Sequence, residues 1–208
     1  MVIDVSPTRM ELLKLRKRVE VARRGHKLLK DKRDQLMKEF LVLVREDREL
    51  REQVEKMLLA ANRSFLVARA VMSREALEAA IMAPKQRVYM EMDTSVIMNV
   101  HVPRFSMRQE GDPLSYGFVD TSSELDAALA AFSEVLALLI RLAQIEKSAE
   151  LLADEIERTR RRVNALEYVL IPELQAAAKD ISMKLSEQER STVARLMKIK
   201  EIVRAEAD

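Results

Sequence analysis

The residue types that perform catalysis or hold metals are sparse in this chain of 208 residues. It contains two histidines, His26 and His101, which lie 75 positions apart, and no cysteine. The missing cysteine excludes a thiol nucleophile, a disulfide and a zinc finger. Two distant histidines do not form the closely spaced ligand cluster of a metal site. The sequence therefore predicts no metal site and no cofactor.

Gly25-His26-Lys27 is the nearest approach to a phosphate-binding loop. It lacks the upstream glycine and the following Ser or Thr that such a loop needs. Asp and Glu are plentiful, but on helix surfaces they have no cleft that raises a pKa for acid–base work. We expect His26 to pack against a partner on a helical seam, and we expect no catalytic residue and no enzyme activity of the chain itself.

Two basic segments remain as candidates for function. Residues 9–38 carry twelve Lys or Arg and four Asp or Glu, a formal charge of +8, whereas the whole chain carries +2. Arg160, Arg161 and Arg162 are consecutive, so in a helix at least one must face outward. Each segment is either a solvated face, as charge runs usually are, or a contact for acidic groups of a partner, which the arginine fork suits. No aromatic residues are interleaved for base stacking, so we expect no nucleic-acid binding.

Composition indicates that long helices carry these residues. Glycine occurs three times in 208 residues, and charged residues make up 34% against about 25% in average proteins. Few glycines disfavour turn-rich β folds, whereas abundant Ala, Leu, Glu, Lys and Arg are typical of coiled coils. The longest uncharged run, residues 94–103, is shorter than the roughly 18 apolar residues of a membrane span. With no signal peptide at the start, we expect no direct membrane insertion.

The first helix is predicted from Ser6-Pro7 to the residue before Pro84. About 76 helical residues would span roughly 110 Å, so the helix must be paired along its length. Eighteen positions at alternating spacings of three and four, from Leu12 to Val71, form its seam, and fourteen of them are apolar. This period of 3.5 residues indicates a coiled coil. Gly25 costs about 1 kcal/mol in a helix interior, so it marks either a close contact or a chance glycine.

The second helix is predicted from Ser122 to the end of the chain. Its seam keeps the same spacing from Leu125 to Leu170, and then stretches to steps of 3-4-4 from Leu174 onward. Such an eleven-residue repeat relaxes the left-handed supercoil. Pro172 is expected to bend this helix mildly.

The two helices are predicted to pair with each other. Folding back at the middle places residue i near residue 205 minus i, so that Asp47 would face the basic cluster from Arg158 to Arg162. The predicted fold class is all-α: a long antiparallel two-helix coiled coil with a small β-hairpin and loop at the turn end. One structural unit is expected, divided into a long helix (1–83), a hairpin and loop head (84–119) and a second long helix (120–208). No second copy of the chain is required.

The head differs from the helices in composition. Residues 87–92 alternate, residues 96–102 are rich in β-branched side chains, and Asp93-Thr94-Ser95 lies between them. We therefore predict a β-hairpin that turns at 93–95, followed by an exposed loop over residues 104–115. A lone hairpin is marginal in water, so it must pack on the helix ends or on a partner. The head also holds four of the eight aromatic residues: Tyr89, Phe105, Tyr116 and Phe118.

Several short sequence motifs resemble those of a known family. Val5-Ser6-Pro7-Thr8-Arg9-Met10, the segment 24–34 (RGHKLLKDKRD) and the segment 159–168 followed by Ile171-Pro172 resemble motifs of the central-stalk D subunit of V-type and A-type rotary ATPases. Val96-Ile97-Met98 and Val102-Pro103 resemble the hairpin of that family. The matches run in order across nearly the whole chain, least clearly over residues 57–86.

The resemblance implies a non-catalytic rotor shaft. In that family the tip of the coiled coil sits in a ring of catalytic and non-catalytic subunits, named A and B, where ATP is hydrolysed or made. The lower part binds the small central-stalk F subunit, and the base docks on the funnel-shaped C/d subunit of the membrane rotor. The resemblance therefore implies a peripheral place in a membrane-bound complex, on its cytoplasmic face.

The partner-contact residues expected from this resemblance and from the charge pattern form two sets. The ring-contact set is Arg9, Arg24, Gly25, Lys27, Arg160, Arg161 and Arg162. The hairpin set, for stalk-base or regulatory contact, is Arg87, Tyr89, Ile97, Met98, Val100 and Val102.

Two other classes of function remain open at this point. A prefoldin-like chaperone subunit also has a helix–hairpin–helix order, although these helices are longer and the quoted motifs differ. A coiled-coil arm for nucleic acid would show steeply salt-dependent binding.

Overall fold

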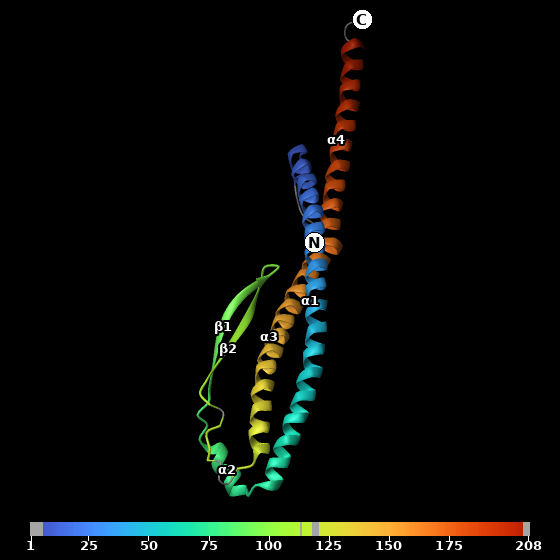
Figure 1. Cartoon of the computed structure of the whole chain (residues 1–208). Helices are drawn as coiled ribbons and strands as arrows, with labels where there is room; N and C mark the ends of the chain where they lie inside the picture. Colours follow the sequence, from blue (N-terminus) through green and yellow to red (C-terminus); the bar gives the residue numbers. More distant parts are fainter. Residues whose placement is uncertain (1–5, 113, 118–120, 206–208) are drawn as a thin grey trace. The chain divides into compact units, whose positions relative to one another are not determined.

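The computed structural model describes residues 6–112, 114–117 and 121–205. Val5, Pro113, Phe118 and Asp208, which entered the sequence expectations, lie outside them. Figure 1 shows the elements in chain order, and they are α1 (Arg9–Val71), α2 (Arg74–Met82), β1 (Arg87–Ile97), β2 (Val100–Glu110), α3 (Ser123–Ala165), the π-helical segment η1 (Leu166–Leu170) and α4 (Ile171–Ala205). The chain divides into two compact units: unit 1 (Met1–Gln35 with Glu157–Asp208) and unit 2 (Leu36–Ile156).

The seam predicted for the first helix is confirmed. Every seam position from Leu12 to Ala68 is buried or half-buried, and only Val71 is exposed. The predicted end of the helix is wrong, because α1 stops at Val71 and a separate short helix, α2, follows. Ser73 begins α2 as its N-cap, and its side-chain oxygen accepts a hydrogen bond from the Ala76 N–H. Such a cap satisfies a backbone donor that has no partner in the first turn.

Unit 1 is an antiparallel helix pair. The start of α1 packs on α4 through a buried cluster of Leu15, Ala22, Leu174 and Ile181. The Arg9 guanidinium bonds Glu189 at 2.5 Å near the end of this pairing. The start of α1 therefore lies beside the middle of α4, in the antiparallel direction that the fold-back arrangement predicts.

The interruption expected at Pro172 takes the form of the π-helical segment η1. In η1 the Ile171 N–H donates to the carbonyl of Leu166, five residues earlier. Pro172 has no N–H, and in the first turn of α4 that donor is not needed. The wider turn absorbs the proline, and the helical run continues to Ala205.

Unit 2 pairs the rest of α1 with α3, again antiparallel. Leu50 and Val54 pack on Leu142 and Ile145 in one cluster. Nearer the turn end, Ala68 joins Leu125 and two α2 residues, Leu77 and Ala80, in another, and the rings of Phe65 and Phe132 meet edge to face. The short helix α2 thus covers the end of the pair, and it follows α1 directly.

The hairpin exists, but its predicted turn is wrong. β1 and β2 pair over eleven residues each, from Arg87↔Glu110 to Ile97↔Val100. The turn is Met98-Asn99, both with positive φ (49° and 72°), which is the two-residue turn whose twist matches paired strands. Asp93-Thr94-Ser95 lies inside β1, and the loop predicted from residue 104 is strand β2 as far as Glu110.

Two contacts close the base of the hairpin. Gly111 has φ of +97°, and a Cβ there would lie 2.5 Å from the carbonyl oxygen of Lys85. Only glycine fits this conformation and this approach. The Tyr116 hydroxyl donates to the Asp126 carboxylate at 2.5 Å, which ties the segment after the hairpin to α3.

The fold class is confirmed, while the predicted register is wrong. Residue 51 was expected near residue 154, but Arg51 pairs with Glu146, and His26 lies opposite Glu167 rather than residue 179. Asp47 interacts with Arg51 of its own helix and does not meet the predicted arginines. Two helices fix their register by the fit of apolar side chains, which the midpoint of a sequence does not specify. The division into 1–83, 84–119 and 120–208 stays a prediction.

One helical stretch within Ser123–Ile202 is long and apolar enough to cross a membrane, with a mean hydropathy of 1.8 and at most two charged residues. The uncharged-run criterion had missed it. Core helices meet the same test, so it is a weak indication of a span. Of this stretch 22% is buried, including Leu142 and Ile145 of α3, which pack against α1.

Candidate partner-contact surfaces

The arginines and the lysine of the predicted ring-contact set on α1 are exposed. Arg24 bonds Glu20 one turn earlier at 2.5 Å, Arg9 bonds Glu189, and Lys27 is exposed. Exposed ion pairs of this kind contribute little to stability, typically about 0–1 kcal/mol. These side chains are therefore free to exchange their present partners for carboxylates of another protein.

Gly25 sits beside the seam and is half-buried. A Cβ built at this position meets no atom within 4 Å among the described residues. The close backbone contact that would require glycine is therefore not made by the described part of the chain. What remains is a contact made by a partner, or a chance glycine.

Arg160, Arg161 and Arg162 are all exposed, which confirms that at least one faces outward. Arg161 bonds Glu157 one turn earlier on its own helix, and this bond lowers the pKa of the Glu157 carboxyl. Within the described part of the chain, Arg160 and Arg162 form no ion pair. The buried neighbour Val163 and the buried Thr159 hold this turn against the seam. The arginines thus project from a turn whose other face is fixed.

His26 lies on the seam with a partner, as predicted. Its Nε2 is 3.2 Å from Oε2 of Glu167. Thr159, two turns before Glu167 on the same continuous helix, carries a buried hydroxyl. Its Oγ1 has no hydrogen-bond partner among the described residues. Neither group forms a cluster for catalysis, and the described residues contain no set of three His, Cys, Asp or Glu that would hold a metal.

The hairpin set is split between a buried tip and an exposed strand. Val102 is 2% exposed and packs with Leu36, Leu152 and Ile156, and Ile97 and Val100 lie against the same cluster. Arg87, Tyr89 and Met98 are exposed. Val102, Ile97 and Val100 pack within unit 2, so the side chains most available to a partner are Arg87 and Tyr89 on the strand and Met98 in the turn.

Sequence reasoning missed three exposed apolar features. The η1 segment exposes Tyr168, Val169 and Leu170. Of these only Leu170 was predicted on the seam, and that prediction is wrong because this residue is 41% exposed. Beyond Glu189, α4 continues without a facing segment of α1 among the described residues. It exposes apolar side chains around more than half of its circumference: Val193, Leu196, Met197, Ile199 and Ile202. The sequence carries no signal for their exposure, because it follows from the register of the helix pair. This register leaves the second helix longer than its partner at this end.

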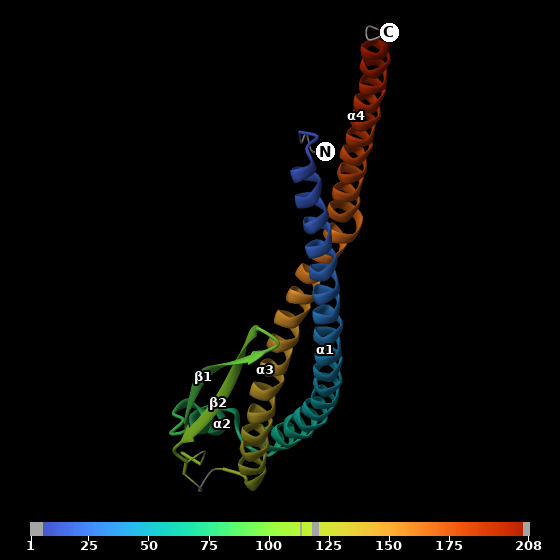
Figure 2. The same ribbon diagram turned by 90° about the horizontal axis from the view of Figure 1, so that it is seen from above.

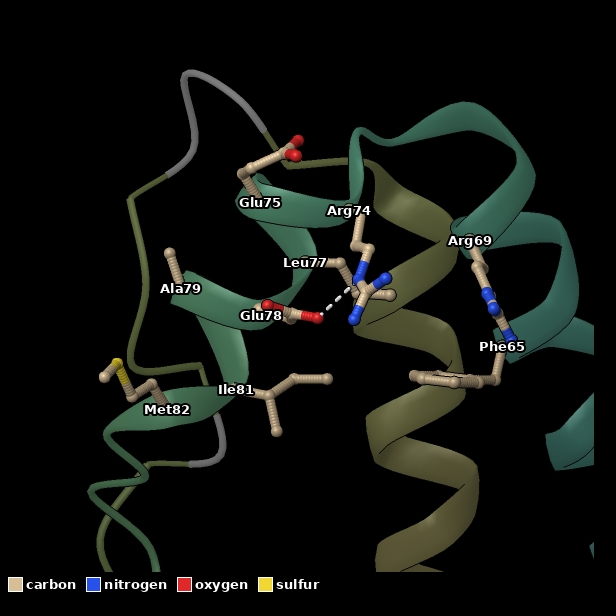
Figure 3. A pocket seen from close by; sticks show the side chains of 9 residues that line it. All are labelled: Phe65, Arg69, Arg74, Glu75, Leu77, Glu78, Ala79, Ile81 and Met82. Atoms are coloured by element: carbon tan, nitrogen blue, oxygen red, sulfur yellow. Dashed lines mark hydrogen bonds and ion pairs between the residues drawn. The ribbon is translucent and has the colours of Figure 1, made fainter.

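The third missed feature is a cleft between the end of α1 and α2, shown in Figure 3. Phe65 and Arg69 of α1 line one side, and Leu77, Ile81 and Met82 of α2 line the other. Arg74 bonds Glu78 across one turn of α2 at 2.7 Å. Ser73, a typical N-cap residue, is the feature of the sequence that indicates a separate helix α2. The cleft holds no convergent acid–base or nucleophilic set among the residues that line it, so its chemistry suits contact rather than catalysis.

The surfaces therefore fall into two groups. The ring-contact set lies entirely in unit 1, and the hairpin set lies entirely in unit 2. Each set offers charged or apolar contact area and no reactive constellation.

The chain is similar to known proteins over nearly its whole length. The family model for the D subunit of ATP synthase matches residues 11–201. The V-type ATP synthase D subunit of Acetivibrio thermocellus is 57% identical, covering 99% of this chain and 95% of the relative. The protein of the same name from Fusobacterium nucleatum is 51% identical over 99% of each chain. That of Clostridioides difficile is 52% identical over 97% of this chain and 92% of the relative. These matches give no support to a prefoldin-like chaperone.

Proposed function

The chain belongs to the family of ATP synthase D subunits, and we propose that it is the torque-transmitting shaft of the central stalk in a V-type rotary ATPase. The observation that carries this proposal is 57% identity over nearly the full length to a V-type ATP synthase D subunit. The chain is thus a peripheral part of a multi-subunit complex that is associated with a membrane.

The paired helices suit a shaft mechanically. In each unit, α1 is joined to the returning helix by buried apolar side chains as well as by exposed ion pairs, which contribute little to stability. Interiors packed this densely have low compressibility and transmit strain. A twist applied to one helix is therefore passed to the other through contacts that do not depend on salt.

We propose that the chain is non-catalytic and that ATP is hydrolysed or made on partner subunits. Among the described residues no metal-holding cluster is present, and the candidate surfaces carry no nucleophile with a base beside it. An asymmetric shaft influences three equivalent sites by contacting each differently, since only differential contacts shift a conformational equilibrium.

The partners follow as further proposals. The A and B subunits of the ring would meet the exposed basic residues of unit 1, with Arg160 and Arg162 foremost. The central-stalk F subunit and the funnel-shaped C/d subunit would meet the lower part of the stalk, including the hairpin. The complex would hold this chain on the cytoplasmic face of the membrane, without insertion of the chain itself and without a second copy.

The experiment is reconstitution of the ATPase ring with and without the chain. We expect the chain to join the ring and to change its rate of ATP turnover. An Arg160→Ala/Arg161→Ala/Arg162→Ala variant should weaken assembly or the coupling of ATP turnover to rotation, while circular dichroism shows unchanged helicity. The matched control is Arg45→Ala/Arg48→Ala/Arg63→Ala, three exposed arginines of α1 outside the proposed contact.

Two results would separate the parts of this proposal. If the chain neither joins the ring nor changes its turnover, the shaft function is wrong. If it joins normally and the first triple variant behaves like the control, only the assignment of the arginines is wrong.

A further inference from the structure

β1 has one edge that is paired with β2 and one edge that is open. In an antiparallel pair, residues alternate between positions whose backbone groups bond the neighbour and positions whose groups point outward. The Phe105 N–H donates to the Gln144 side chain of α3 at 2.9 Å, so the Met92↔Phe105 pair points outward. By the same alternation, the N–H and C=O of Val88, Met90, Met92, Thr94 and Val96 face away from β2.

The outer edge of β2 is already covered, whereas that of β1 is free. Gln144 occupies the outward donor of Phe105, and Pro103 has no N–H at the outward position opposite Thr94. The bonds of Phe105 with Gln144 and of Gln109 with Ser133 place β2 on the side of the hairpin that faces α3, as Figure 1 also shows. Figure 2 shows the hairpin beside α3 from another side. No hydrogen bond from another described residue reaches the outward backbone groups of β1. An open edge of this length is a template for another strand.

The side chains at the same outward positions are apolar and exposed. Val88, Met90, Met92 and Val96 are 43%, 60%, 67% and 58% exposed, and Thr94 completes the row. Because strand side chains alternate, these five lie on one face of β1. Methionine is over-used at adaptable binding surfaces, because its side chain is flexible and polarizable. An incoming strand would gain apolar contacts on this face in addition to backbone hydrogen bonds.

The opposite face of β1 selects the charge of the occupant. Glu91 and Asp93 are exposed there, two positions apart. Arg104 of β2 lies opposite Asp93, whereas Glu91 lies opposite the uncharged Ser106. A second copy of β1 pairing along its whole length would be centred on Met92 and would set Glu91 against Asp93 twice. Like charges directly opposite each other destabilise a strand pair. A strand with Lys or Arg at these two positions forms opposite-charge pairs instead.

We propose that the open edge of β1 binds an extended segment of a partner protein, apolar on one face and basic on the other, as a third strand of the sheet. This inference deepens the hairpin contact in the proposed function. Its tests on the isolated chain can fail while the shaft function stands.

The first test uses a synthetic eleven-residue peptide that alternates Val or Thr with Lys, measured by fluorescence anisotropy on the full chain. The control peptide has the same sequence with the backbone amides of its pairing edge N-methylated. Each hydrogen bond lost from a buried pair is worth up to about tenfold in affinity, so we expect binding of the first peptide and a loss of at least that size for the second. Equal binding of both would overturn strand addition.

The matched protein variants act at Met92. Met92→Pro removes one outward N–H and no bond to β2. Pro103 is a natural proline at such an outward position of β2. The variant should abolish peptide binding. Met92→Thr keeps the N–H and should retain most of it. Amide exchange at residues 91 and 93 reports that the β1–β2 ladder is intact in both. Unchanged binding by the folded Met92→Pro chain would exclude this edge.

The charge of the occupant is tested by Glu91→Lys/Asp93→Lys. The affinity of this variant for the Lys peptide should fall by about tenfold or more. It should instead bind a peptide that has Glu in place of Lys. If wild-type chain instead self-associates in sedimentation and Met92→Pro prevents it, the occupant is a second copy, and the proposed partner is wrong.

The natural partner is tested in the purified ATPase complex by hydrogen exchange. Amides 88, 90, 92, 94 and 96 should exchange more than about tenfold more slowly in the complex than in the isolated chain. A partner helix lying on the face would not supply acceptors at alternate amides. The absence of alternating protection in the complex would overturn the inference.

Discussion

The seam of the helix pairs and the hairpin use apolar side chains in opposite ways. On α1, all but one of the eighteen seam positions are buried or half-buried within the chain. On β1, ten of eleven residues are exposed, including two methionines and two valines. The helices bury each other's apolar side chains. The hairpin is held at its tip and its base, and the side chains of β1 between them stay exposed. The difference separates the residues that make the shaft from those that serve contact.

The largest effect is expected from the seam. Leu36 is 0% exposed and packs with Val102, Leu152 and Ile156. Leu36→Ala should lower the free energy of unfolding by about 3 kcal/mol, since it leaves a cavity among leucine-sized neighbours. Urea unfolding followed by circular dichroism measures it.

The control for this prediction is Leu28→Ala, on an α1 residue that is 69% exposed. Its change should stay within about 0.5 kcal/mol. Similar losses in both variants would mean that the seam is not the source of stability.

A smaller, local effect is expected at the base of the hairpin. Gly111→Ala combines a positive φ with a Cβ that would lie 2.5 Å from the Lys85 carbonyl oxygen. The strain should cost about 2 kcal/mol, and it should appear as faster amide exchange in β1 and β2 with little change in the helices. Equal loss of protection in the helices would show that the hairpin and the seam unfold together. This result would contradict the distinction between the two regions.

A third prediction concerns Tyr116, which joins the head to α3. Burial and the hydrogen bond to Asp126 raise the pKa of the Tyr116 hydroxyl above its ordinary value of 10.0. Since the fold favours the neutral phenol, its stabilisation is complete below about pH 10 and declines as pH rises above that value. Tyr116→Phe should lose about 1 kcal/mol at pH 7 and should show a shallower decline above about pH 10.

Urea titrations at pH 7, 10 and 11 measure this dependence. Tyr168→Phe, on an exposed ring in η1, should leave the stability at pH 7 unchanged. A wild-type chain that gains stability above pH 10 would contradict the assigned hydrogen bond.

The smallest effect is expected at Gly25, where an added Cβ meets no atom within 4 Å among the described residues. Gly25→Ala should stabilise the isolated chain by about 1 kcal/mol, because alanine is the better helix former. If a partner backbone packs against this glycine, the same variant should assemble less well with the ring. Higher stability with unchanged assembly would identify a chance glycine and would remove Gly25 from the contact surface.

Several features could be predicted because they depend on local pattern. The 3.5-residue seam, the start of the second helix and the outward direction of at least one of the three arginines follow from spacing and handedness alone. The turn was misplaced because Asp93-Thr94-Ser95 is typical of turns, whereas Met98 rarely takes a positive φ. Its place is fixed by the tip residues Val100 and Val102, which must reach the cluster around Leu36.

The amino-acid sequence by itself determined that this chain is a pair of long helices with a hairpin between them. Periodicity and composition are properties of neighbouring residues, and they suffice for those conclusions. Only the tertiary structure decided the register of the helix pairs, the burial of the hairpin tip and the open edge of β1. Each of these depends on which distant side chains fit together, and a change of one turn in register is invisible in a repeating pattern.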